Sequence, residues 1–156
     1  MNLPAGAAPV RVAILVMTYN SAKTVGETLA SVNNVPDRPG FSSDIHVFDN
    51  ASTDDTLVTV ERCLPLSRSL EIHTRPANRG HWRSLNDACL NLAPSHDWIL
   101  ILHSDDIAKP CWLPTMQDAI ARSDDKVAAI CSSYDRWDPV TNVIEPGEDV
   151  PERGYE

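Results

Sequence analysis

The stretch Trp98-Ile99-Leu100-Ile101-Leu102-His103-Ser104-Asp105-Asp106 dominates the folding pattern of this chain, because five uninterrupted apolar residues lead into a polar end with two adjacent carboxylates. A continuous apolar run of this length is typical of a strand that is buried on both faces of a parallel sheet covered by helices. We therefore predict a buried central strand over 98–102. The carboxylates would follow its carboxyl end, where open α/β sheets bind ligands.

The two adjacent acids allow two interpretations. Neighbouring carboxylates repel each other, and a divalent cation with oxygen ligands relieves that repulsion while also holding a diphosphate. The first interpretation is therefore a metal and nucleotide site at Asp105 and Asp106. The second is structural, with Asp106 capping a helix that begins near Pro110. Taken alone, the stretch favours neither interpretation.

The composition limits the class of protein. The 156 residues suffice for one domain with a core, and 42% hydrophobic and 22% charged residues are ordinary for a globular protein. The net charge of −9 argues against a basic patch that binds nucleic acid or an anionic membrane. Any anionic ligand would need a local source of positive charge, such as a metal, a helix N-terminus or a few arginines.

The cysteine pattern and the N-terminus indicate the compartment. No CxxC pair occurs, which argues against a zinc site, and the spread cysteines suggest core thiols in a reducing compartment. Residues 1–9 lack the basic region of a signal peptide, and no apolar run approaches the roughly 20 residues that span a bilayer. We expect a cytoplasmic protein, at the inner face of the membrane if it belongs to a longer enzyme. The four cysteines are Cys63, Cys89, Cys111 and Cys131.

Apolar patterns predict alternating strands and helices. β-branched and aliphatic runs indicate five strands, and helical spacing indicates four helices between them. This order implies an α/β fold, a Rossmann-like sandwich with a mainly parallel sheet flanked by helices. We predict one α/β domain over 1–134 and an irregular acidic tail over 135–156. The predicted strands are 10–16, 45–48, 70–74, 98–102 and 127–131, and the predicted helices are 22–32, 52–64, 82–92 and 110–120.

Three of the predicted strands end in polar clusters. These are Thr18-Tyr19-Asn20, Asp49-Asn50-Ala51-Ser52 and His103-Ser104-Asp105-Asp106. The carboxyl ends of parallel strands share one edge of the sheet, so we expect the clusters to converge on one crevice. The chain has neither GxGxxG nor GxxxxGK[ST], which disfavours a dinucleotide fingerprint and a P-loop.

The order of these motifs resembles a known family. Val-Met-Thr-Tyr-Asn, Phe-Asp-Asn-Ala-Ser-Thr-Asp-Asp-Thr, Asn-Arg-Gly and His-Ser-Asp-Asp follow one another as in family-2 glycosyltransferases of the GT-A fold. Each motif alone is weak evidence, but four in this order and spacing are strong. The resemblance extends over residues 10–133, most of the chain.

The resemblance implies roles for residues of the first two motifs. Thr18, Tyr19 and Asn20 would hold the nucleotide, and an acid of the second motif would pair with its base. The sequence reads Asp49-Asn50 where many members have two aspartates, so either residue could face the base.

The resemblance also implies contacts to the diphosphate and the metal. Arg83 lies where the family often carries a basic contact to the diphosphate, although it could equally be a solvated helix arginine. His103 replaces the first acid of an Asp-x-Asp motif, and we interpret it as structural rather than as a ligand. Ser104 and Asp105 would contact the nucleotide, and Asp105 and Asp106 would bind Mg²⁺ or Mn²⁺.

The implied function is that of a glycosyltransferase, inverting and metal-dependent, in polysaccharide or glycoconjugate synthesis. The donor would be a UDP sugar, with GDP or dTDP as alternatives, and the acceptor a sugar or a lipid-linked molecule. Inverting members need a general base, which we expect to lie outside this chain, in a missing acceptor-binding half. The alternative is a non-catalytic nucleotide-binding or regulatory domain. Uncovered edge strands could also pair two chains into a homodimer.

The four tryptophans divide into three expected core residues and one candidate for sugar contact. Trp82, Trp98 and Trp112 lie in the predicted helices and strands, and we expect them to be in the core. Trp137 is the one tryptophan that we consider for contact with a sugar.

Overall fold

The computed structural model describes residues 8–124, 126–138 and 140–147. Four parallel strands form one sheet in the order β3-β2-β1-β4, and two antiparallel strands form a separate hairpin. The predicted α/β class with a mainly parallel sheet and flanking helices is therefore confirmed. The elements are β1 (Val10–Thr18), α1 (Val25–Asn33), β2 (Phe41–Asp49), α2 (Thr56–Arg62), β3 (Leu70–Thr74), α3 (His81–Leu92), β4 (Trp98–His103), α4 (Trp112–Arg122), β5 (Asp135–Asp138) and β6 (Val143–Pro146).

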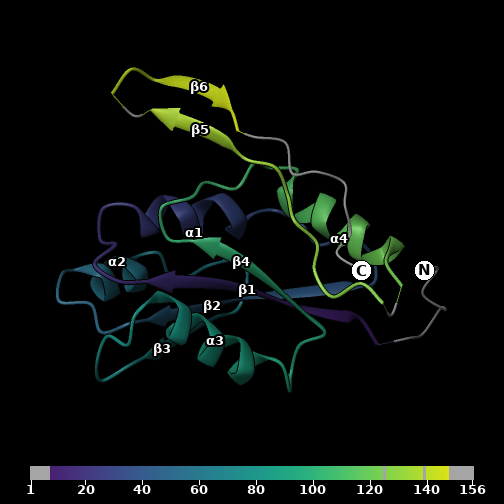
Figure 1. Cartoon of the computed structure of the whole chain (residues 1–156), viewed down its shortest axis with the longest axis horizontal. Helices are drawn as coiled ribbons and strands as arrows, with labels where there is room; N and C mark the ends of the chain where they lie inside the picture. Colours follow the sequence, from purple (N-terminus) through teal and green to yellow (C-terminus); the bar gives the residue numbers. More distant parts are fainter. Residues whose placement is uncertain (1–7, 125, 139, 148–156) are drawn as a thin grey trace.

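Helices cover both faces of the sheet (Figure 1). α1, α2 and α4 pack on one face, around alternate residues of β1 such as Ile14. α3 packs on the other face, around the intervening residues such as Leu15. β1 is consequently buried on both sides from residue 12 to residue 18, as a parallel strand between two helical layers should be.

The prediction of a central, doubly buried strand was wrong for β4 and fits β1 instead. β4 lies at the edge of the four-stranded sheet, with Leu100 and Leu102 buried but Ile101 43% exposed. A helix is about 10 Å wide and strands lie about 4.8 Å apart, so one helix covers roughly two strands. α3 alone therefore cannot bury its whole face of the sheet, and β4 remains partly open.

The fifth predicted strand was also wrong. Residues 127–131 belong to no strand, and the hairpin of β5 and β6 forms further along, in the segment predicted to be irregular. A local turn explains the hairpin, because an oxygen of the Asp138 carboxylate accepts a hydrogen bond from the backbone N–H of Val140 at 2.8 Å. Asn142 adopts φ of 55°, the left-handed conformation that closes tight turns. The part of the predicted tail over 148–156 lies outside the described residues.

Three helices begin later than predicted: α1 at Val25, α2 at Thr56 and α4 at Trp112. α2 begins after Asp55, and Ser52 and Thr53 lie ahead of it in the loop. α4 begins after Cys111, so Asp106 does not cap it. The interpretation of Asp106 as the cap of α4 is thereby excluded.

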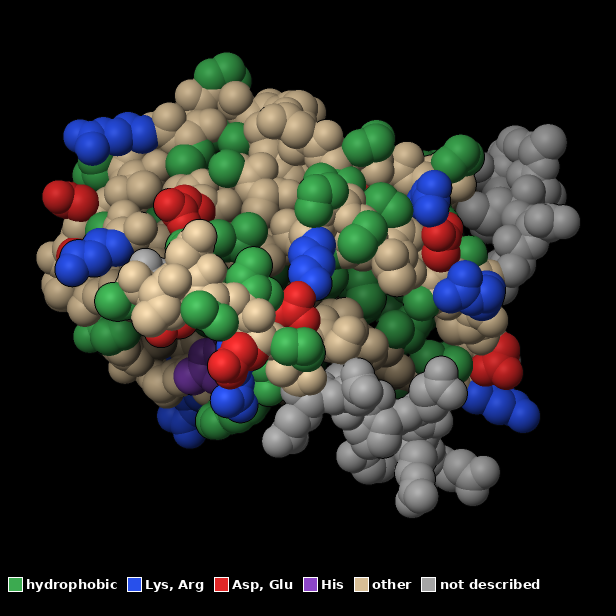
Figure 2. All heavy atoms as spheres, turned by 90° about the horizontal axis from the view of Figure 1, so that it is seen from above, with side chains coloured by type: hydrophobic (Ala, Val, Ile, Leu, Met, Phe, Trp, Pro, Cys, Tyr) green, Lys and Arg blue, Asp and Glu red, His purple; other side chains and the backbone are tan. Residues whose placement is uncertain are grey.

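The cysteines are free, as predicted, but only two are even partly buried. Cys63 and Cys89 are half-buried, whereas Cys111 and Cys131 are exposed. No helix among the described residues is long and apolar enough to cross a membrane. On the side of α1, α4 and the hairpin, Lys and Arg side chains lie singly among acidic and apolar ones (Figure 2).

Candidate functional site

Hydrogen bonds connect the loops that follow β1, β2 and β4. The backbone N–H of Asn20 donates to the Ser52 hydroxyl at 2.9 Å, which links the first loop to the second. The hydroxyl oxygens of Ser21 and Ser104 lie 2.8 Å apart, which links the loop after β1 to the loop after β4. The predicted convergence of the three polar clusters at one sheet edge is therefore present in the structure.

Asp49 ends β2 and is 2% exposed. One of its carboxylate oxygens accepts a hydrogen bond from the Thr18 hydroxyl at 2.9 Å and another from the Ser52 hydroxyl at 2.5 Å. Within the described residues, the other oxygen accepts a single hydrogen bond, from the backbone N–H of Ser52 at 2.8 Å. Because each carboxylate oxygen has two lone pairs, this second oxygen retains acceptor capacity.

Asn50 is also buried, but its amide is more fully used. Its oxygen accepts hydrogen bonds from the Ser84 hydroxyl at 2.7 Å and from the backbone N–H of Arg79 at 3.2 Å. Its nitrogen donates to the Asn78 side chain at 2.8 Å. Asn50 therefore fixes the loop before α3 and the first turns of that helix against the end of β2.

The cluster at the end of β1 has one buried residue in the strand and two exposed residues in the loop that follows. Thr18 is 2% exposed, while Tyr19 is 48% exposed and Asn20 is exposed as well. Asn20 has φ of 53°, and its side-chain oxygen accepts the backbone N–H of Thr53 at 2.8 Å. Asparagine tolerates this left-handed conformation, and the two hydrogen bonds of Asn20 hold its loop against the loop after β2, while the Tyr19 ring stays exposed.

Asp105 and Asp106 lie in a turn directly after β4. The backbone N–H of Asp106 donates to the carbonyl of His103 at 3.1 Å, which closes the turn. Both side chains are exposed, and within the described residues neither carboxylate has a hydrogen-bond or ion-pair partner. Free carboxylate oxygens suit a hard divalent cation such as Mg²⁺ or Mn²⁺.

His81 is a residue of this edge that the sequence reasoning missed. It begins α3, and its ring stacks on that of His103 with centroids 5.5 Å apart. The signal was its position directly after Asn-Arg-Gly, the motif that Asn50 ties to the site. His103 is exposed, and its interpretation as a structural residue stays a prediction.

The start of α3 also presents Trp82 and Arg83. Trp82 is 79% exposed, so its predicted place in the core was wrong: it lies on the first turn of the helix, outside the face that packs on the sheet. Arg83 is exposed and has no hydrogen-bond or ion-pair partner within the described part of the chain. Arg75 and Arg79, by contrast, both pair with Asp87, at 3.0 and 3.3 Å.

The other tryptophans follow the predictions more closely. Trp98 and Trp112 are partly buried and pack against the larger apolar core. Trp137 is 49% exposed, and its indole N–H donates to the Asn142 side chain at 3.1 Å within the hairpin.

The fold and this edge define a nucleotide-binding-type α/β protein, in which loops at the carboxyl ends of parallel strands form the site. The family described as "Glycosyl transferase family 2" matches residues 13–151. The chain therefore belongs to glycosyl transferase family 2, and its sheet and helices are those of the GT-A fold.

Individual relatives agree with this family. An uncharacterized glycosyltransferase of Haemophilus influenzae is 28% identical over 115 residues, which are 72% of this chain and 33% of the relative. S. aureus TarS 1-349 in complex with UDP-GlcNAc is 29% identical, with a TM-score of 0.58, and the match covers 72% of this chain and 30% of TarS 1-349.

A third relative is a mannosyltransferase. The mannosyltransferase PcManGT from Pyrobaculum calidifontis, in complex with GDP-Man and Mn²⁺, is 27% identical with a TM-score of 0.59. That match covers 81% of this chain and 37% of PcManGT. The chain thus spans about a third of the length of these relatives.

Proposed function

We propose that this chain is the donor-binding portion of a glycosyltransferase that uses a nucleotide-diphosphate sugar and a divalent cation. The observation that carries the proposal is the set of three linked loops at one sheet edge, with the unpaired carboxylates of Asp105 and Asp106 among them. Relatives in complex with UDP-GlcNAc and with GDP-Man and Mn²⁺ support the same ligand class. UDP is the favoured nucleotide, with GDP or dTDP as alternatives.

Asp49, rather than Asn50, is the proposed contact to the base. Its second carboxylate oxygen accepts one hydrogen bond and can accept another, from an N–H of the base. Asn50 is committed to Asn78, Arg79 and Ser84 and acts as a positioning residue. Tyr19 would lie beside the base or ribose, while Thr18 and Asn20 support the carboxylate and the loop.

The phosphate end of the donor would lie between β4 and α3. Asp105 and Asp106 would hold Mg²⁺ or Mn²⁺, Ser104 and Asp105 would approach the nucleotide, and Arg83 would contact the diphosphate. A bound cation would neutralise charge on the departing nucleoside diphosphate. The exposed guanidinium of Arg83 would supply a second positive charge that needs no metal.

A non-catalytic nucleotide-binding domain is the second candidate, and the engagement of two of the acids after α4 favours it for this chain alone. Asp135 is paired with Lys109, and Asp138 is bonded to its own turn. Glu145 is exposed on β6, while Glu148 and Asp149 lie outside the described residues. A general base supplied from outside this chain, an inverting reaction and an acceptor in cell-surface polysaccharide synthesis remain proposals for the whole protein.

We further propose that a domain over 1–134 is followed by a separate segment. A homodimer would use the open edge of β4 or β3, and a cytoplasmic location would suit a nucleotide-sugar donor.

Calorimetric titration with UDP, GDP and dTDP, each with and without Mn²⁺, tests the donor site. We expect one nucleotide to bind with 1:1 stoichiometry, and binding to weaken on addition of a chelator. The D105A/D106A double variant should lose the Mn²⁺-dependent component. E61A, which removes an exposed acid from the far end of α2, is the matched control and should bind as the wild type does.

Failure of all three nucleotides to bind under any metal condition would refute the donor-site proposal. Incubation with the matching nucleotide sugar then separates the two candidates. Release of free sugar by the chain would favour the enzyme, whereas binding without turnover would favour the non-catalytic domain for this chain in isolation.

A further inference from the structure

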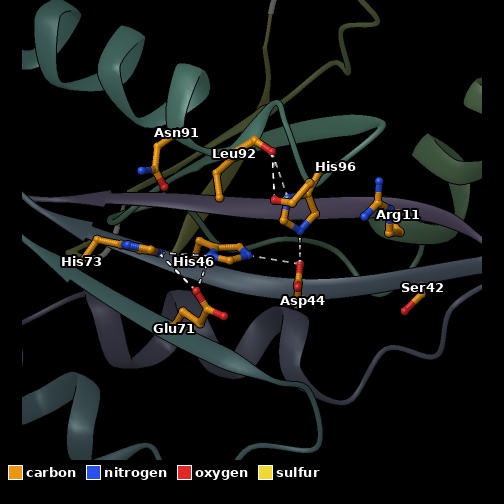
Figure 3. Close-up of a pocket in the computed structure, with 10 residues that line it drawn as sticks. Arg11, Ser42, Asp44, His46, Glu71, His73, Asn91, Leu92 and His96 are labelled. Carbon is orange, nitrogen blue, oxygen red and sulfur yellow. Dashed lines mark hydrogen bonds and ion pairs between the residues drawn. The ribbon is translucent and has the colours of Figure 1, made fainter.

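A cavity of about 320 Å³ lies away from the donor edge, between the sheet and the carboxyl end of α3. Three histidines and two acids line it, and they come from β2, β3 and the segment after α3 (Figure 3). None of them belongs to the proposed donor site. The five residues are Asp44, His46, Glu71, His73 and His96.

The strand register brings two of the histidines together. His46 of β2 is paired with Glu71 of β3, and Glu71 and His73 lie two residues apart on the same face of β3. Figure 3 shows the two imidazoles meeting from neighbouring strands, with the Glu71 carboxylate beside the point where they meet.

The ligand atoms of this triad have the spacing of a metal site. Nδ1 of His46 lies 3.2 Å from Nε2 of His73, and both nitrogens lie 3.7 Å from one carboxylate oxygen of Glu71. Ligands about 2.0–2.1 Å from a tetrahedral Zn²⁺ are separated by roughly 3.3–3.4 Å. The three atoms therefore already form a triangle close in size to one face of such a tetrahedron.

The opposite nitrogen of His46 faces a second carboxylate. The His46 side chain is 4% exposed, and its Nε2 lies 3.3 Å from an Asp44 oxygen without completing a hydrogen bond. Nδ1 of His46 shares a hydrogen bond with Nε2 of His73, and a proton on Nε2 of His46 would point towards Asp44 and leave the lone pair of Nδ1 for a ligand. A carboxylate behind a ligating histidine is the usual arrangement that fixes the tautomer at zinc sites.

Neighbouring contacts hold the other parts of the cluster in place. The His73 ring stacks on Phe48 with centroids 4.0 Å apart, which limits its rotation. Nε2 of His96 lies 3.0 Å from the same Asp44 oxygen, and its Nδ1 lies 2.9 Å from the Ser95 hydroxyl. His96 thus steadies Asp44 and is already engaged at both nitrogens.

We propose that Nδ1 of His46, Nε2 of His73 and the carboxylate of Glu71 bind Zn²⁺ or a similar first-row divalent cation, with Asp44 orienting His46. Solvent would complete the coordination through the cavity. Two imidazoles and one carboxylate suit such a cation far better than Mg²⁺, which prefers oxygen ligands. The site is independent of the donor site, and it would tie the edge strand β3 to β2. Arg11 lies at the rim of the cavity. Its Nε lies 3.9 Å from a carboxylate oxygen of Asp97, and this carboxylate offsets part of the positive charge of Arg11.

Titration of the chain with Zn²⁺ alone, followed by calorimetry, and with Co²⁺, followed by absorption, tests the site without any nucleotide. We expect one Zn²⁺ per chain, a higher melting temperature, and a Co²⁺ spectrum of nitrogen and oxygen ligation without a thiolate band. H73Q and E71Q change partly exposed side chains, so they should fold, and each should weaken Zn²⁺ binding at least about 10-fold. Mg²⁺ should produce none of these changes.

Three further variants show which residues bind the ion. D44N should weaken Zn²⁺ binding about 10–100-fold through the orientation of His46. H96Q should change it only a few-fold, and D105A/D106A should leave it unchanged. Absence of stoichiometric Zn²⁺ binding, a thiolate band, or binding that survives H73Q would overturn the proposal. Binding that is lost in H96Q but retained in H73Q would move the ion to the Asp44, His46 and His96 triad and would also overturn it. Failure here would not affect the donor site, which is tested with nucleotides.

Discussion

The hydroxyl groups of Ser21 and Ser104, 83 residues apart in the chain, lie 2.8 Å from each other and join the loop after β1 to the loop after β4. Ser104 precedes Asp105, so this bond helps to place the proposed metal-binding acids relative to the nucleotide loop. We expect S21A to weaken nucleotide binding about 2–10-fold, the worth of one ordinary hydrogen bond. Calorimetry measures the change, and S42A, an exposed serine near the start of β2, is the control.

The same pair allows a stricter test. If the hydrogen bond is the reason for the effect, S21A/S104A should bind no more weakly than S104A alone, because each change removes the same bond. Additive losses would show that the two hydroxyls act separately.

Asn50 should matter for stability. N50A removes hydrogen bonds to Asn78, Arg79 and Ser84 and leaves the buried Ser84 hydroxyl without its acceptor. We expect a loss of about 1–3 kcal/mol in the free energy of unfolding, measured with urea. N91A, on an exposed part of α3, should change this free energy by less than about 0.5 kcal/mol. Equal effects of the two variants would contradict the positioning role.

Arg83 should discriminate between the phosphates and the nucleoside. R83A is expected to weaken UDP binding about 10–100-fold, since hydrogen bonds to charged groups contribute about 1.5–3 kcal/mol. Uridine binding should not change, because the nucleoside has no diphosphate. R62A removes an exposed arginine from the last turn of α2 and serves as the control. Equal weakening of UDP and uridine by R83A would argue against a phosphate contact.

Asp37 should make the chain sensitive to acid. Burial alone would raise the pKa of Asp37, but hydrogen bonds from Ser43, Arg68 and Gln117 and the charge of Arg68 outweigh it and lower the pKa. The folded state thus binds the proton less readily than the unfolded chain, whose pKa is near 3.8. The resulting stability is present above that pH and is lost as the pH falls through the folded pKa.

The matching variant is D37N, which leaves the nearly buried guanidinium of Arg68 without its partner. We expect a loss of about 3 kcal/mol or more at pH 7, the cost of breaking a buried ion pair. The difference from the wild type should shrink as the pH approaches 3 in urea unfolding experiments. A difference that does not depend on pH would contradict this explanation.

His73 should make the stability of the chain depend on pH between pH 7 and pH 5. Burial first, and then the neighbouring His46, lower the pKa of His73, while Glu71 opposes the shift. The folded state therefore disfavours the protonated imidazole, and its contribution to stability falls as the pH drops below the unfolded value of about 6.5. Without added metal, the wild type should lose more stability between pH 7 and pH 5 than H73Q does. Parallel pH curves for the two proteins would refute the expectation.

Much of the layout was predictable from short-range patterns. The third strand was predicted at its observed bounds, and the first was predicted from Val10, because an alternation of apolar runs and helical spacing reflects burial directly. The convergence of polar clusters followed from parallel strands alone. The family motifs then indicated which of these polar residues to consider for the donor.

Features that depend on distant neighbours were not predictable. The sequence of β4 reads as a central strand, yet its position at the edge depends on which strands pair and how much one helix covers. The hairpin is local and was missed for another reason, because its turn lies in a polar, acidic segment without the alternating apolar pattern of a buried strand. Asn50 and Asp49 look alike in sequence, and only their hydrogen bonds distinguish a positioning amide from a carboxylate that can still accept.

The sequence by itself therefore determined the α/β alternation, the polar strand ends and the family. The tertiary structure alone decided that His46 and His73, 27 positions apart, meet across two strands at 3.2 Å. The absence of CxxC had argued against zinc, because a sequence shows only ligands that are close along the chain. Strand register is set by the pairing of whole strands and by their burial, and it brings together ligands that no local spacing relates.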